Sequence, residues 1–294
     1  MHSYLKAIGY SRIKTRQEVN ELIKEAVDRA ISEKVCTLSN ETAAMEAEFE
    51  CADSVGLIVR GEYDDIDEFH FEHYAPFLRG SQVSTTPKVF VNKRVDTDAY
   101  TAMCDDSRIG ISLIFYLQNV VDYLKIRDIE AAPCKLEVSL SGLAQEGKII
   151  LPTYKTPEID KILSNKSHKH SEMVAEARKG NRDAMEYLTF EELDTYSEIS
   201  TRALTEDILS IVDTSLIPYG SESDIYYILA NIKTVRYTEN RMTGEMMCIM
   251  RVECNGLELD ICINKEDLLG EPEPGRRFKG NIWLQGRVNF EEWI

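Results

Sequence analysis

The sequence lacks a long apolar run and a Cys-x-x-Cys pair, and it has fewer basic than acidic side chains. No stretch of about 18 apolar residues is present, so no membrane-spanning helix is expected. The opening residues, MHSYLKAIGYSRIK, contain no apolar segment long enough for a signal peptide, so we expect a cytoplasmic protein. The seven cysteines are scattered and odd in number. They are expected to be free thiols, mostly buried, in a reducing compartment.

The shortage of basic residues limits the partners. Lysine and arginine number 34 against 51 acidic residues, which gives a formal net charge of -17. Acids exceed bases in both halves of the chain, so the excess is not a tail. Such a field repels phosphate polymers and anionic membranes. A membrane partner and generic nucleic-acid binding are therefore disfavoured, while a local basic patch stays open.

The common enzyme motifs are also missing. The chain has no Gly-x-x-x-x-Gly-Lys-Ser/Thr loop, no Gly-x-Gly-x-x-Gly, no Gly-x-Ser-x-Gly and no His-Glu-x-x-His. These are the signatures of nucleotide hydrolysis, dinucleotide binding, serine hydrolases and zinc peptidases. Enzymatic activity is thus uncertain and less favoured than binding, and no cofactor is expected.

The pattern along the chain predicts an α+β protein in three parts. A capping box at Thr15 and Glu18 opens an amphipathic helix, and the next hundred residues are mainly strand-like, with a hairpin between 136–140 and 149–151. We therefore expect an N-terminal α/β domain over residues 1–155. A helical connecting segment follows at 156–220, with a second capping box at Thr189 and Glu192.

Residues 221–294 are predicted to form an antiparallel β domain. Asn255-Gly256 fits a type I′ hairpin turn, which would place Cys254 opposite Leu257 and Arg251 opposite Asp260. A helical turn and one long strand come after the hairpin. This order suggests a small barrel similar to an OB-fold, and a small open sheet packed on the helices is the alternative.

The last strand contains the most informative stretch, FKGNIWLQGRVNF at 278–290. Alternate positions are apolar or glycine and belong in a core, while Trp283 falls on the polar face. Arg277, Lys279 and Arg287 share that face, and residues 275–290 contain no acid. Aromatic and basic side chains together can bind single-stranded nucleic acid or another anion. The alternative is that Trp283 packs inside the chain or against a protein partner or a second copy, with the cations paired to the surplus acids.

The stretch DDIDEFHFEHY at 64–74 is the densest set of potential metal ligands. His70 and His73, with Asp67 or Glu72, offer imidazole and carboxylate groups that suit zinc or another divalent ion. The competing interpretation is a solvated acidic loop that carries two titrating histidines.

Several strings resemble one particular family. They are DLLGEP at 267–272, GRRFKG at 275–280, IWLQG at 282–286, the opening MHSYLKAIGYSRI, IGISLIFYLQN at 109–119 and LIPYGSESDIYYIL at 216–229. Together they are similar to a bacterial family of unknown function from clostridia-like Firmicutes. The resemblance covers nearly the whole chain and implies a bacterial cytoplasmic protein. It brings no activity and no site residues.

Three functions remain in order of preference. The first is a non-enzymatic protein-interaction or regulatory module, for which Trp283 should be covered by protein. The second is single-stranded nucleic-acid or anion binding through the face around Trp283, which requires that side chain to be exposed. The third is a metal-dependent enzyme that uses the 64–74 cluster.

Overall fold

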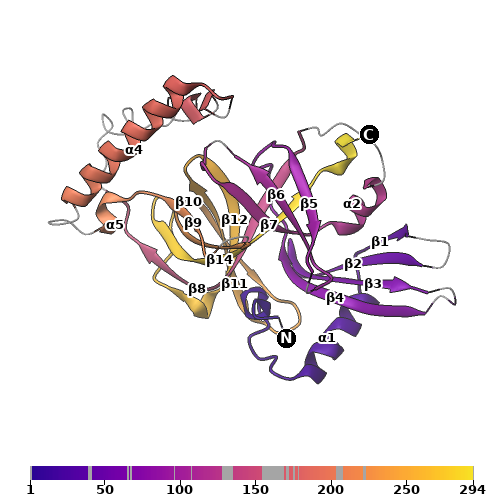
Figure 1. Cartoon of the computed structure of the whole chain (residues 1–294). Coiled ribbons are helices and arrows are strands. Elements are labelled where there is room, and N and C mark those ends of the chain that lie inside the picture. Colours follow the sequence, from indigo (N-terminus) through magenta and orange to yellow (C-terminus); the bar gives the residue numbers. More distant parts are fainter. Residues whose placement is uncertain are drawn as a thin grey trace.

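The computed structural model in Figure 1 describes most of the chain. The described residues are 2–38, 42–64, 66, 68–95, 97–106, 108–127, 135–153, 169, 172–174, 176–177, 179–202, 208–220 and 223–293. The molecule is an α+β protein in which a closed barrel lies beside a four-stranded sheet, with a few helices around them. Several of the buried polar side chains lie at the interface between the barrel and the sheet.

Five strands close the barrel. They are β8 (Val138–Ile150), β10 (Ile225–Glu239), β11 (Met246–Cys254), β12 (Leu257–Asn264) and β14 (Arg277–Val288). The order around the barrel is β8-β12-β11-β10-β14, and β14 pairs back onto β8. The β8–β12 pair is parallel and the other four are antiparallel. Phe278, Ile282, Leu284 and Val288 of β14 point into the barrel core, as their alternation predicts.

The barrel sheet continues beyond β14. The end of β14 pairs with β7 (Ser112–Leu117), which pairs with β6 (Tyr100–Asp105), and that in turn with the edge strand β5 (Val89–Lys93). Two short strands complete the sheet: β9 (Ser215–Pro218) on β10 and β13 (Leu268–Leu269) on β8. The β5–β6–β7 extension therefore projects from the barrel with one face on the core and one face outward.

The second sheet is an antiparallel meander. It consists of β1 (Ser32–Thr37), β2 (Ala43–Ala52), β3 (Val55–Tyr63) and β4 (Phe69–Leu78) in sequence order. Helix α1 (Arg16–Asp28) covers its apolar face, as Figure 1 shows, and buries Val19, Leu22 and Ile23 there. The predicted capping box of α1 is present: Thr15 accepts from the Glu18 amide and the Glu18 carboxylate accepts from the Thr15 amide.

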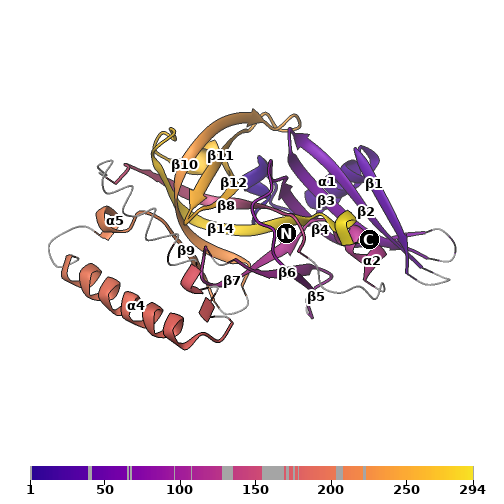
Figure 2. The same cartoon turned by 90° about the horizontal axis from the view of Figure 1, so that it is seen from above.

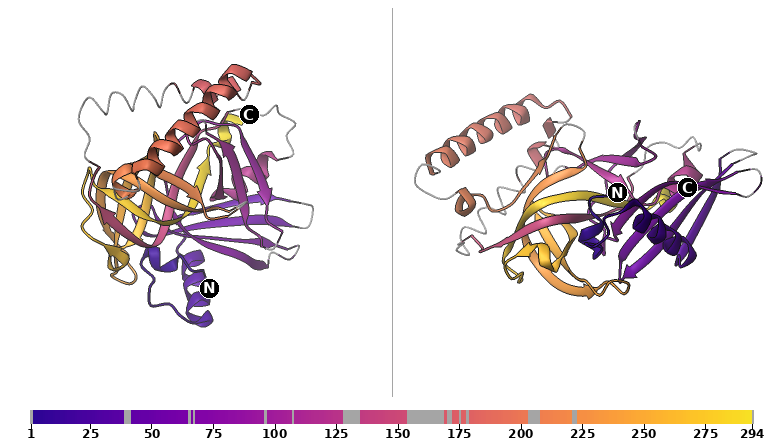
Figure 3. Two further views of the ribbon diagram at one scale, coloured as in Figure 1. Left: turned by 60° about the vertical axis from the view of Figure 1, so that its left-hand side comes forward. Right: turned by 90° about the horizontal axis from the view of Figure 1, so that it is seen from below.

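The remaining helices are short except one. They are α2 (Val120–Ile126), α4 (Arg182–Arg202), α5 (Ile208–Ile211) and the 3-10 turns Leu5–Ile8, Lys265–Asp267 and Phe290–Trp293. Figures 2 and 3 show α4 on the far side of the barrel from the four-stranded sheet, opposite α1. Among the helices that the structure describes, none has the length and apolar character needed to cross a membrane.

Two sequence-based predictions are wrong. Residues 138–150 form one continuous strand rather than a hairpin with a turn at 141–147, because β12, β13 and β14 supply hydrogen-bonding partners along this whole length. Thr189 does not cap a helix, since α4 runs through it and its hydroxyl donates to the Met185 carbonyl one turn back. A capping-box pattern inside a longer helical stretch has no structural consequence.

The Asn-Gly hairpin is confirmed in its register. Cys254 lies opposite Leu257 and Arg251 opposite Asp260, and Asn255 and Gly256 both have positive φ. The predicted charged pair forms at 3.4 Å between Arg251 Nε and Asp260 Oδ1. Local turn chemistry therefore determines this part of the barrel.

The predicted α+β class with a barrel is confirmed. The barrel takes β8 from the stretch 1–155 and its other strands from 221–294, so strands on both sides of the connecting segment share one core. The division at 155 and 220, and the OB-like architecture, stay predictions. Of the connecting segment, residues 156–168, 170–171, 175, 178 and 203–207 lie outside the described residues.

Candidate functional site

Trp283 lies inside the molecule, with 6% of its surface exposed. Its ring stacks on Tyr4 at 5.4 Å between centroids and contacts His2 and Tyr116. Its indole N–H donates to Asp224 Oδ2 at 2.8 Å. The aromatic residue on the polar face of β14 is therefore the contact between the barrel and the N-terminal 3-10 turn.

The three basic residues of the same strand face do not form one surface. Arg277 is buried and donates to the carbonyl oxygens of Leu151, Leu209 and Val212. Lys279 is half-buried with its ammonium 5.8 Å from the Tyr227 ring centroid. Because Arg277 holds carbonyl oxygens after β8 and around α5, and the indole of Trp283 is covered, these residues of β14 do not form an exposed aromatic and basic surface.

The two predicted metal-binding histidines point to different environments. His70 is exposed and lies 2.8 Å from Asp64, and with Glu68 these groups could hold an ion, since their ligand atoms lie within 4.8 Å of one another. His73 turns inward onto the Tyr116 ring, and burial together with Arg60 lowers its pKa to about 3. Asp67 lies outside the described residues.

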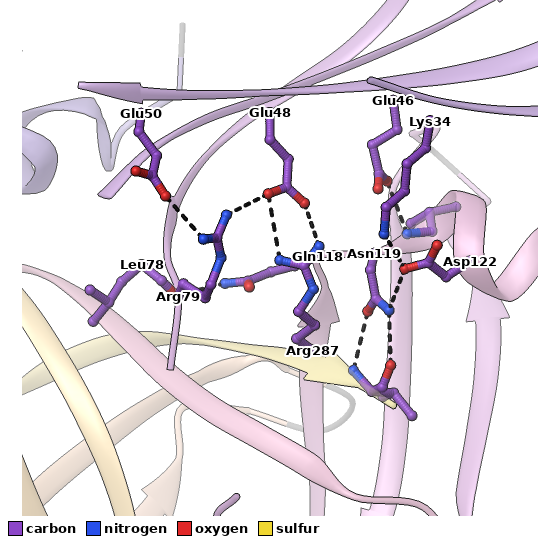
Figure 4. A network of polar contacts seen from close by, with 12 residues as sticks. Lys34, Glu46, Glu48, Glu50, Leu78, Arg79, Gln118, Asn119, Asp122 and Arg287 are labelled. Atoms are coloured by element: carbon purple, nitrogen blue, oxygen red, sulfur yellow. Dashed lines mark hydrogen bonds and ion pairs between the residues drawn. The ribbon is translucent and has the colours of Figure 1, made fainter. Parts of the chain in front are cut away.

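Arg287, the fourth predicted residue, belongs to a polar layer between the four-stranded sheet and the barrel (Figure 4). It forms an ion pair with Glu48 of β2, which also accepts from Arg79 at 2.7 Å. Burial raises the pKa of Glu48, but the two guanidinium groups outweigh it, and the net pKa is lowered. The Glu48 carboxylate thus ties the chain after β4 and the end of β14 to the middle of β2.

Glu46 is next to Glu48 on the same face of β2 and is fully buried. Its Oε2 accepts from the Val120 amide at the start of α2 at 2.9 Å, and its Oε1 has no hydrogen-bond partner. Burial raises the pKa of Glu46 to about 7. The α2 start is further fixed by Asn119, which bonds to Val288 and Asp122, and by the Lys34–Asp122 ion pair at 2.6 Å.

A buried amide network completes the layer. The Gln118 side chain donates to Gln285 and to the Leu78 carbonyl, and the Ser141 hydroxyl donates to the same carbonyl. Gln285 in turn donates to the Pro76 carbonyl. These bonds join the end of β4 to β7, β8 and β14, so the polar layer sets how the sheet sits on the barrel.

The polar layer opens at one end into a groove of about 500 Å³. Lys34, Lys125 and Arg287 line it together with Asp122, Glu137 and Glu291. The groove has equal numbers of opposite charges, and Lys34, Asp122 and Arg287 are already in ion pairs within the layer, so it shows no preference for a ligand of one sign.

Another groove, with an apolar floor, lies on the outer face of the β5–β6–β7 extension. Phe90, Met103 and Ile114 are register neighbours across the three strands and form one row. Phe90 is 52% and Met103 36% exposed. The adjoining groove, about 880 Å³, continues over Asn92, Thr101 and Ile225. At its other end the same face is covered by Trp283 packing on Tyr116.

The sequence-based search missed the polar layer, although a signal was present. In AAMEAEFE, residues 43–50, acids at 46, 48 and 50 alternate with Met45, Ala47 and Phe49. This is the period of a strand with one charged face. The partners of that face, Arg79 and Arg287, are far away in sequence, so nothing local showed that the face is buried.

One family model matches the chain, over residues 5–286, and its description is "Domain of unknown function, E. rectale Gene description (DUF3881)". The chain belongs to the DUF3881 family. No curated protein and no solved structure matches it. The family match includes the sheet, the polar layer up to residue 286 and nearly all of β14, so a DUF3881 domain comprises both the sheet and the barrel.

Proposed function

We propose that the protein is a non-enzymatic, cytoplasmic interaction or regulatory module that binds another protein through the outer face of β5, β6 and β7. The observation that carries this proposal is the row of exposed Phe90 and Met103 with the partly buried Ile114 beside them. Large apolar side chains gathered on one sheet face are typical of protein interfaces, whereas single exposed ones are common everywhere.

The surroundings of the row suit an interface. Asn92, Thr101, Lys93 and Arg94 surround it with polar groups, which matches an apolar centre with a polar rim. The position at the edge of the ten-stranded sheet also allows an extended partner segment to lie alongside β5. The interaction hypothesis expected Trp283 to be covered by protein, and the structure covers it within the chain.

The two other hypotheses receive less support. The nucleic-acid hypothesis needs an exposed Trp283 beside Arg277, and both side chains are buried. The metal hypothesis has the group of Asp64, Glu68 and His70, but exposed acidic groups of this kind are common without an ion. The proposed function therefore includes neither nucleic-acid binding nor metal binding.

Photo-crosslinking tests the proposed surface. Benzoylphenylalanine would replace Phe90 or Met103 in cells that make the protein. Tyr237, which is 46% exposed near the opposite end of β10 from Ile225, would be the matched control. We expect positions 90 and 103 to capture the same protein, and position 237 not to. Capture of a second copy of the chain would make the module self-associating. Products at 90 and 103 no different from those at 237 would overturn the proposal.

A further inference from the structure

A second cavity lies between the four-stranded sheet and α2, separate from the groove on β5–β7. Its volume is about 220 Å³. One side is apolar and the other is charged. The apolar side consists of Leu38, Ala44, Val120, Val121 and Leu124, and the charged side includes Arg60, Glu62, Glu72, Lys93 and Asp98.

Arg60 is the unusual member of this cavity. Its side chain reaches from the middle of β3, and the residue is 5% exposed. The guanidinium donates to the Asp98 carbonyl at 2.9 Å and lies 3.5 Å from the Tyr116 hydroxyl, while its Nε–H has no acceptor. Across the described residues, no carboxylate comes within 4 Å of it. A buried guanidinium without a counterion is costly, so this site favours an anionic group supplied from outside.

The cross-strand neighbours of Arg60 do not supply that group. Glu46 and His73 occupy the paired positions on β2 and β4. The carboxyl of Glu46 bonds to the start of α2 and forms no ion pair with Arg60. His73 is neutral, because burial and Arg60 itself lower its pKa to about 3. Arg60 therefore has no carboxylate in direct contact, and its charge acts on Glu46 and Glu72 only through space.

The acidic side of the same cavity favours a cationic group. Glu62 and Glu72 line it, and burial and then the carboxylates of Glu62 and Asp98 raise the pKa of Glu72. Glu72 is the extra residue of a β-bulge, since Arg60 pairs with His73 and Gly61 with Phe71. A Cβ at Gly61 would lie 2.2 Å from the His70 carbonyl oxygen, so this bulge requires glycine. Bulges of this kind re-aim a side chain, here that of Glu72.

We propose that this cavity binds a free α-amino acid with an apolar side chain. Its carboxylate would accept from Nη1 of Arg60, which makes no hydrogen bond within the described residues and, unlike the enclosed Nε, keeps accessible surface. Its ammonium would bind the carboxylates of Glu62 and Glu72. Its side chain would pack on Val120, Val121 and Leu124 of α2. A zwitterion satisfies both charged sides at once, whereas a simple anion would be repelled by the two glutamates. The volume of the cavity fits a molecule of this size.

Calorimetric titration of the full chain with L-leucine tests the proposal, with 4-methylpentanoate and 3-methylbutylamine as probes that keep only one charged end. We expect L-leucine to bind and each half-ligand to bind about tenfold more weakly or less. No heat with L-leucine, L-isoleucine or L-methionine at millimolar concentration would overturn the proposal. Equal affinity for 4-methylpentanoate and L-leucine would overturn the role of the glutamates.

Three variants locate the site. Arg60→Met should remain folded, because it removes a buried charge that lacks a counterion, and should lose L-leucine binding about tenfold or more. Glu72→Gln, at an exposed bulge, should weaken L-leucine but not 4-methylpentanoate. Glu33→Gln, exposed on β1, is the control and should bind like the unchanged protein. If Arg60→Met does not fold, Glu72→Gln still tests the proposed site. An L-leucine affinity that is unchanged in Glu72→Gln would contradict it.

Discussion

A single carboxylate oxygen of Asp224 binds both the Trp283 indole and the Arg94 guanidinium, which are far from it in sequence. Its Oδ2 accepts from the Trp283 indole at 2.8 Å and pairs with Arg94 at 2.9 Å. The indole nitrogen is thereby satisfied in the interior, which is the condition for burying a tryptophan. Its place on a polar strand face follows, because that face is covered by His2 and Tyr4 instead of water.

Glu46 makes the stability of the protein depend on pH in an uncommon direction. Burial raises its pKa from 4.5 to about 7 in the folded state. Between these values the folded protein holds a proton that the unfolded chain releases. The protonated Glu46 carboxyl therefore makes its full contribution to the free energy of unfolding below about pH 4.5, and this contribution is lost as the pH rises to 7.

Glu46→Gln should remove this dependence, because the amide stays neutral and its oxygen can still accept from Val120. At pH 8 we expect the variant to be more stable than the unchanged protein by on the order of 1–3 kcal/mol, with the difference disappearing near pH 4.5. Urea unfolding across this pH range measures it. Glu33→Gln is the control and should run parallel to the unchanged protein. Parallel profiles for Glu46→Gln as well would show that Glu46 titrates normally.

At the scale of elements, β14 joins the barrel to the β5–β6–β7 extension, because it pairs with β8 and β10 and also with β7. A Cβ on Gly286 would lie 2.5 Å from the Phe115 ring of β7 and 3.2 Å from Leu140 of β8. Both side chains are fully buried and have little room to withdraw, so this position of β14 favours glycine.

Gly286→Ala should therefore destabilise the protein by about 1–3 kcal/mol through overpacking. Gly220→Ala is a matched control, because a Cβ there meets nothing within 4 Å and should change stability by less than about 0.5 kcal/mol. Thermal unfolding of both variants compares them. Equal melting temperatures would mean that Phe115 moves aside without cost.

Structural elements that are determined by residues close together in the chain could be predicted from the sequence. Asn255-Gly256 fixes its own hairpin, and Thr15 with Glu18 starts α1. Strand β8 could not be predicted as one piece, because its small residues Ser141, Gly142 and Gly147 indicate a turn until its partners are known. The partners of β8 come more than a hundred residues later.

The candidate sites also contain features that the local sequence predicts and features that depend on distant residues. The alternation of β14 correctly placed Trp283 and Arg287 on the face opposite the barrel core. What covers that face could not be read from the strand itself, since His2, Tyr4 and Glu48 belong to other elements. Arg60 and Glu72 line the same cavity beside a bulge, which changes register without a clear signal in the sequence.

For the whole molecule, Glu48 is the main electrostatic link between the sheet and the barrel side. Its side chain is 4% exposed and holds both Arg79 and Arg287 (Figure 4). Removing its charge would leave two guanidinium groups close together without a shared counterion.

Glu48→Gln should cost about 2 kcal/mol or more. This is less than the 3–5 kcal/mol typical of a fully buried pair, because both arginines are partly exposed. Glu50→Gln is the control: Glu50 also pairs with Arg79, at 3.0 Å, but is more exposed. Urea unfolding would measure both. An equal loss in the two variants would contradict the central role of Glu48.

The closed barrel also has a consequence during synthesis. The β1–β4 meander needs only neighbouring strands and can form as soon as it is made, whereas β8 finds its partners only when β12 and β14 appear. At roughly 5–20 residues per second, β8 waits on the order of ten seconds for β14. During that interval the apolar face of β8 is unprotected, so the newly made chain depends on chaperones most strongly while the second half of the barrel is being translated.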